Sequence, residues 1–119
     1  MSPSLRSPIY YLLFAFIVLF VWDAMQPAHA QELPTFQLTA KDGYITPATL
    51  EVPAGKKIKL MLKNTGSTPE EFESTQPRME KVLAPGASSF VVIQPLAPGK
   101  YTIFGEFHPD TARCELIAR

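Results

Sequence analysis

The chain has 119 residues, enough for one small domain, and eleven Lys and Arg residues balance eleven Asp and Glu residues. A neutral chain without a basic face argues against nucleic acid as a partner. A single cysteine excludes an internal disulfide, so the fold must be stable without one.

The first thirty residues differ from the rest of the chain. Arg6 lies in a weakly positive start, residues 9–22 form an apolar run, and Ala28-His29-Ala30 is a small-x-small triplet. This order is typical of a secretory signal peptide helix, and the run is shorter than the roughly 20 residues that a spanning helix needs. We predict cleavage after Ala30, with an uncleaved anchor as the alternative. The two parts are then residues 1–30, a signal peptide, and residues 31–119, the exported domain.

After the apolar run, short segments of alternating apolar and polar residues are separated by turn signals such as Asp42-Gly43, Pro53-Ala54-Gly55 and Pro85-Gly86. The expected strands cover residues 35–40, 49–52, 57–63, 70–74, 79–83, 90–93, 101–104 and 114–118, and residues 44–47 are extended. About eight short strands at close spacing, without an internal repeat, predict one all-β domain built as a sandwich or barrel.

Three landmarks resemble the cupredoxin fold. Residues 50–60 look like its second and third strands with their glycine turn, and Asn64 and Pro69 look like the loop before its first metal-ligand strand. Residues 98–104, with Pro-Gly-x-Tyr at their start, then lead to His108, as in the strand that ends in the second ligand loop. The resemblance implies a cupredoxin-like Greek-key β-sandwich over nearly all of residues 35–118.

The ligand positions of blue-copper members are changed. Gly105 stands at the cysteine position, Thr111 near the methionine position, and Glu70 at the first histidine position, whereas His108 is kept. A blue-copper site requires a thiolate and two imidazoles. Cys114 lies six residues after His108 and does not restore the pattern, so the sequence argues against a conventional blue-copper electron carrier.

A narrower resemblance rests on residues 69–74, Glu80-Lys81 and residues 104–110. These strings look like the cupredoxin-like periplasmic component of bacterial iron-uptake systems with an Ftr-type permease. The resemblance implies a periplasmic protein that binds iron, copper or both, and that hands ferrous iron to a permease in the inner membrane. It leaves open whether the protein oxidises the iron, and it leaves a homodimer open.

The residues themselves suggest an oxygen-rich metal site. On a strand, Glu71 and Glu73 share one face, while Glu70 shares the other with Phe72, so the three carboxylates converge only if the strand bends. Clustered carboxylates with one imidazole suit iron, manganese or copper(II), and a bound cation relieves their repulsion. The candidate metal ligands are Glu70, Glu71, Glu73, Met79, Glu80, Glu106, His108 and Asp110.

Each candidate has a structural alternative. An acidic run often marks a solvated strand edge, Met79 is typical of a core position, and Cys114 is typical of a small apolar filler. Three function classes follow: a non-enzymatic metal-binding protein of iron uptake, which the sequence favours, a metal-dependent ferrous oxidase, and a metal-free interaction module. An atypical cupredoxin in electron transfer or copper handling is a further alternative.

Overall fold

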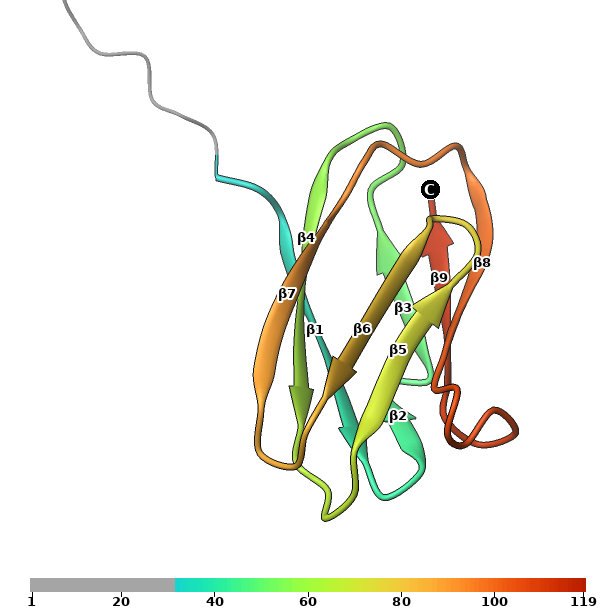
Figure 1. Ribbon diagram of the computed structural model, residues 1–119. Coiled ribbons are helices and arrows are strands. Elements are labelled where there is room, and N and C mark those ends of the chain that lie inside the picture. The colour runs from blue at the N-terminus through green and yellow to red at the C-terminus, as the bar shows by residue number, and fades with distance from the viewer. Residues whose placement is uncertain (1–31) are drawn as a thin grey trace, which may run out of the picture. The chain divides into compact units, whose positions relative to one another are not determined.

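The computed structural model describes residues 32–119, so the predicted signal peptide lies outside the described part. The described chain forms nine strands in two sheets, which confirms the all-β sandwich (Figure 1). The strands are β1 (Thr35–Lys41), β2 (Tyr44–Thr46), β3 (Thr49–Val52), β4 (Ile58–Asn64), β5 (Glu70–Ser74), β6 (Met79–Leu83), β7 (Ser88–Ile93), β8 (Gly99–Phe104) and β9 (Arg113–Ala118). The ninth strand is β2, within the segment predicted to be extended.

The two sheets differ in size, and the larger one contains β5, the strand with the acidic run. The four-stranded sheet has the order β2-β1-β4-β7, and the five-stranded sheet has the order β3-β9-β8-β5-β6. The β1–β4 and β3–β9 pairs are parallel, and the others are antiparallel. Residues 32–119 contain no helix that is long and apolar enough to cross a membrane.

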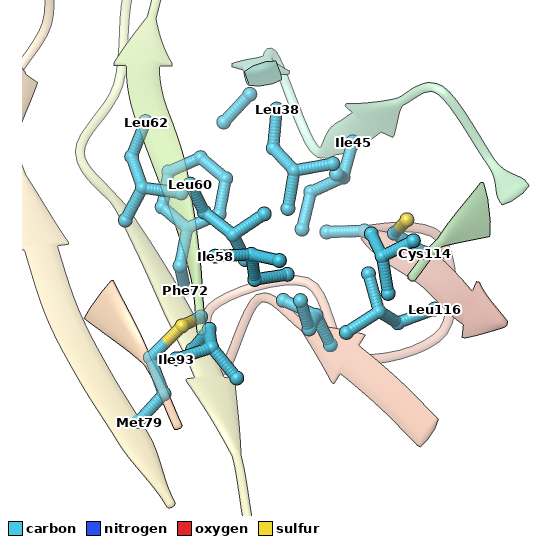
Figure 2. Packing of buried hydrophobic residues seen from close by; sticks show 14 of the residues in the cluster. Leu38, Ile45, Ile58, Leu60, Leu62, Phe72, Met79, Ile93, Cys114 and Leu116 are labelled. Atoms are coloured by element: carbon cyan, nitrogen blue, oxygen red, sulfur yellow. The ribbon is translucent and has the colours of Figure 1, made fainter. Parts of the chain in front are cut away.

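The core lies between the sheets and follows the alternation in the sequence. Ile58, Leu60 and Leu62 of β4 are at most 1% exposed and face Phe72 of β5, which is fully buried. Figure 2 shows these side chains packed together, with Cys114 among the apolar residues. Each such aliphatic side chain contributes about 1.5–3 kcal/mol by leaving water.

One end of the sandwich is held by hydrogen bonds between loops. The side-chain amide nitrogen of Asn64 donates to the carbonyl oxygens of Thr68 (2.8 Å) and Leu83 (3.0 Å). The Asp42 carboxylate accepts from the backbone N–H of Ser67 at 2.9 Å. These bonds order the loop that enters β5, and β5 carries the acidic run.

Candidate functional site

Glu70 and His108 meet directly on the inner side of β5. The Glu70 Oε2 atom lies 2.7 Å from the His108 Nδ1 atom, and the two share a hydrogen bond. The Glu70 side chain is 3% exposed and the His108 side chain 40% exposed. The Glu70 Oε1 atom also accepts from the backbone N–H of Glu71 at 3.1 Å. The buried carboxylate is therefore satisfied by an imidazole and a backbone amide.

Two glycines make room for this pair. A Cβ atom on Gly105 would lie 2.5 Å from Glu70 Oε1 and 2.8 Å from the Ala112 Cβ atom. A Cβ atom on Gly43, whose φ is +88°, would lie 3.1 Å from the His108 ring. The sequence marked Gly105 only as a missing cysteine, whereas the structure shows that the Glu70 carboxyl fills the space beside it.

This arrangement does not fit a blue-copper centre. The thiolate of such a centre would have to come from position 105, where a Cβ atom already collides with Glu70 and Ala112. A thiolate and two imidazoles are required there, and among residues 32–119 the one imidazole is that of His108. The region that resembles the copper-ligand loop is therefore occupied by a hydrogen-bonded carboxylate–imidazole pair.

A second group of carboxylates gathers on the outer face of the same sheet. Glu71, Glu73 and Glu106 each offer an oxygen atom, and these oxygens lie within 4.8 Å of one another. Glu71 and Glu73 come from β5, and Glu106 comes from the loop between β8 and β9 (Figure 1). The alternation of β5 thus divides the acidic run as predicted, with Glu70 on the inner face.

Glu71 is the unusual member of this outer group. Its side chain belongs to the outer face of the sheet, yet the residue is only 2% exposed. Its pKa is raised from an ordinary value of 4.5 to about 8, because it shares a hydrogen bond with the Glu106 carboxyl, because it is buried, and because it shares a second bond with Glu80. Two carboxyl groups form such a bond only with a proton between them, and a cation in the same place would replace that proton.

The strand registers extend the outer group into one row across four strands. Glu80 of β6 pairs with Glu73 of β5, Glu73 pairs with Phe104 of β8, and Phe104 pairs with Arg113 of β9. Residues paired across a sheet share a face and lie about 5 Å apart. The row therefore contains two acidic residues, Glu80 and Glu73, then the aromatic Phe104 and then the basic Arg113.

The remaining predicted ligands lie elsewhere. Met79 is 5% exposed and belongs to the hydrophobic core, where Figure 2 shows it beside Ile93. Asp110 is exposed on the loop between β8 and β9, outside the group of three carboxylates. The sequence reasoning passed over Arg113, because only the strand register brings it into the same row as Glu73.

Oxygen donors at this spacing suit a hard cation. Iron, manganese and copper(II) accept carboxylate ligands, and a bound cation would relieve the repulsion among the three groups. Glu71, Glu73 and Glu106 are the residues that would hold such an ion, and Glu80 lies next to them in the ladder. The donor set lacks sulfur, so it does not suit copper(I).

Comparisons with solved structures agree with this fold. The chain is similar to reduced auracyanin from the photosynthetic bacterium Roseiflexus castenholzii, with a TM-score of 0.62, 15% identity, and coverage of 75% of this chain and 99% of auracyanin. It is also similar to the metal-binding domain of the Cu(I)-exporting P-type ATPase CopA of Streptococcus pneumoniae D39, with a TM-score of 0.66, 7% identity, and coverage of 77% and 91%. At these identities the likeness shows the fold alone.

Sequence comparisons give the family. An uncharacterized protein of Rickettsia prowazekii (strain Madrid E), RP394, is 38% identical over 107 residues, which is 89% of this chain and 86% of that protein. Residues 12–118 match the family described as cupredoxin-like domain. The match spans most of the chain and includes every strand of both sheets. The protein therefore belongs to the cupredoxin-like domain family.

Proposed function

We propose that this protein is an exported carrier of a metal ion, iron or copper(II), which it holds on the carboxylates of Glu71, Glu73 and Glu106. The observation that carries the proposal is the 2% exposed Glu71 carboxyl, whose hydrogen-bonding neighbours are other carboxyl groups. A buried carboxylate among carboxylates needs a proton or a cation, and above its pKa a cation is the favoured partner.

More specifically, we propose that the protein acts in the periplasm, where it delivers iron to a permease in the inner membrane. The resemblance of residues 69–74 and 104–110 to the periplasmic component of Ftr-type iron uptake supports this role. The donor set adds support, because carboxylates bind iron well and leave other positions on the ion open. Glu106 lies on the loop between β8 and β9 and is exposed, so one ligand of the cargo is within reach of a partner.

The test is a metal titration of the full chain, expressed with its own export signal, purified in the form that the cell exports and treated with a chelator. Mn²⁺ and Cu²⁺ are titrated in air, and Fe²⁺ is titrated without oxygen. We expect one ion per chain. Glu71→Gln and Glu106→Gln should each weaken binding by about tenfold or more, because each removes a charged ligand. Glu115→Gln is the matched control, since Glu115 is exposed and lies outside the group.

A second pair of variants distinguishes the outer carboxylates from the inner pair. Glu70→Ala and His108→Ala remove the hydrogen-bonded pair and leave the three outer carboxyl groups in the chain. His108→Ala is the cleaner variant, because Glu70→Ala also removes the acceptor of the Glu71 backbone N–H. Loss of metal binding in these variants only, with Glu71→Gln unaffected, would overturn the outer site and return the metal to His108. Equal affinity in all variants would overturn both assignments, because the ion would then bind elsewhere. No binding to any variant or to the wild type would favour a metal-free interaction module.

A further inference from the structure

A cleft opens on the outer face of the five-stranded sheet, beside the carboxylates. Its volume is about 410 Å³, and it is lined by Thr75 and Gln76 of the β5–β6 loop, by Lys100, Thr102 and Phe104 of β8, and by Arg113 of β9, among others. Lys100, Thr102 and Phe104 lie on the face of β8 opposite to the buried Ile103, whereas Tyr101, which also lines the cleft, belongs to the other face. The volume falls in the range of sites for small molecules, about 300–1,000 Å³.

The cleft is positively charged. Lys100 and Arg113 are the charged residues of its lining, and neither forms an ion pair with any residue from 32 to 119. Glu115, which pairs with Thr102 on the same face, lies beside the cleft and outside its lining. One guanidinium nitrogen of Arg113 donates to the Pro109 carbonyl oxygen at 3.1 Å, which orients the group at the rim and leaves its other N–H groups for a ligand.

The two cations are spaced for an anion with more than one charged group. Arg113 pairs with Phe104, and Lys100 lies four residues before Phe104, so their Cα atoms are roughly 13 Å apart along the strand. Both side chains are long and flexible, and each can reach toward a molecule over Thr102. The Phe104 ring and the Thr102 side chain supply a surface with apolar parts between the charges.

The cleft adjoins the proposed metal site. Phe104 lines the cleft and pairs with Glu73, and Glu106 follows two residues later in the chain. The Cα atoms of Arg113 and Glu73 are therefore about 10 Å apart, two strands away, a distance that the arginine side chain and a polycarboxylate together can span. Three protein carboxylates leave positions open on an iron or manganese ion, which commonly takes six oxygen ligands.

We propose that the cleft binds a small di- or tricarboxylate anion, held by Arg113 and Lys100, and that this anion completes the coordination of the neighbouring metal. The cargo is then a metal–polycarboxylate complex. A planar carboxylate matches the fork of the arginine guanidinium, and the volume is large for inorganic phosphate. Binding of the anion in the cleft does not depend on the proposed function. Formation of the metal–polycarboxylate complex rests on the proposed function.

Equilibrium dialysis of the full, exported protein against ¹⁴C-citrate, ⁵⁴Mn²⁺ or both tests the two parts separately. With both labels we expect one citrate and one Mn²⁺ on each chain. In Arg113→Gln and Lys100→Gln, citrate affinity should fall about tenfold in the absence of metal, because a charge-assisted contact is lost. Lys57→Gln, at an exposed lysine outside the cleft, should behave as the wild type.

Glu71→Gln should bind Mn²⁺ about tenfold or more weakly and keep the wild-type affinity for citrate without metal, which separates failure of the metal site from failure of the anion site. If citrate binds equally to the wild type and to Arg113→Gln, Lys100→Gln and Lys57→Gln, the assignment of the cleft is overturned. It is also overturned if inorganic phosphate, at the same concentration as citrate, displaces the citrate. Binding of both labels, each unaffected by the presence of the other, would overturn the mixed complex and leave two independent sites.

Discussion

Replacement of Glu71 by glutamine should stabilise the metal-free protein at alkaline pH, although it removes a proposed ligand. The pKa of Glu71 is about 8 in the folded protein, against an ordinary value of 4.5. Between these two pH values the folded state binds more protons than the unfolded state, so the free energy of unfolding falls as the pH rises. Glutamine does not ionise in this pH range, so the free energy of unfolding of Glu71→Gln should not fall for this reason.

The size of the effect follows from the two pKa values. They differ by about 3.5, and each pKa unit corresponds to about 1.4 kcal/mol, which sets an upper limit near 5 kcal/mol. The largest cause of the shift is the hydrogen bond to Glu106, and Glu106 is exposed, so solvent weakens this contribution and we expect about 2 kcal/mol at pH 9. For a domain of this size, about 2 kcal/mol raises the melting temperature by roughly 10 °C.

Thermal unfolding followed by circular dichroism, with chelator present, measures the difference at pH 5, 7 and 9. We expect Glu71→Gln to match the wild type at pH 5 and to melt higher at pH 9, with Glu115→Gln unchanged throughout. A fixed concentration of Mn²⁺ that saturates the wild type should raise the wild-type melting temperature by more than it raises that of the variant. A variant that melts lower than the wild type at pH 9 without metal would refute the reasoning about Glu71.

Three further variants or treatments address the inner pair and the core. Gly105→Ala should cost about 1–3 kcal/mol in urea unfolding, because the new Cβ atom meets Glu70 and Ala112, and adding Glu70→Ala should restore part of the loss. His108→Ala should cost about 2–3 kcal/mol, because the Glu70 carboxylate stays buried without its imidazole partner. Burial raises the pKa of the Cys114 thiol to about 11, so a thiol reagent at pH 8 should label the protein only in denaturant.

Controls make each of these results decisive. If Gly105→Ala and Glu70→Ala have additive effects, the close approach of the two residues is not the cause of the loss. If His108→Ala unfolds at the wild-type urea concentration, the pair does not contribute to stability. Rapid labelling of Cys114 in native buffer would contradict its position in the core, and Met79→Leu offers a matched core change with little expected cost.

The sequence predicted the sandwich and the division of the acidic run, because both depend on local alternation. Strands with period two place Glu71 and Glu73 on one face and Glu70 on the other, whatever the partners of the strand. Turn signals such as Asp42-Gly43 separate the strands in the same local way. The core role of Phe72 follows from the same rule.

Only the tertiary structure decided which acids meet. Glu106 joins Glu71 and Glu73 because a loop folds back over β5, and no spacing in the sequence specifies that path. Glu70 and His108, 38 residues apart, form a pair only because Gly105 leaves room for the carboxyl. Long-range register likewise sets Arg113 in the row with Glu73, since a shift of one residue would turn its side chain to the other face.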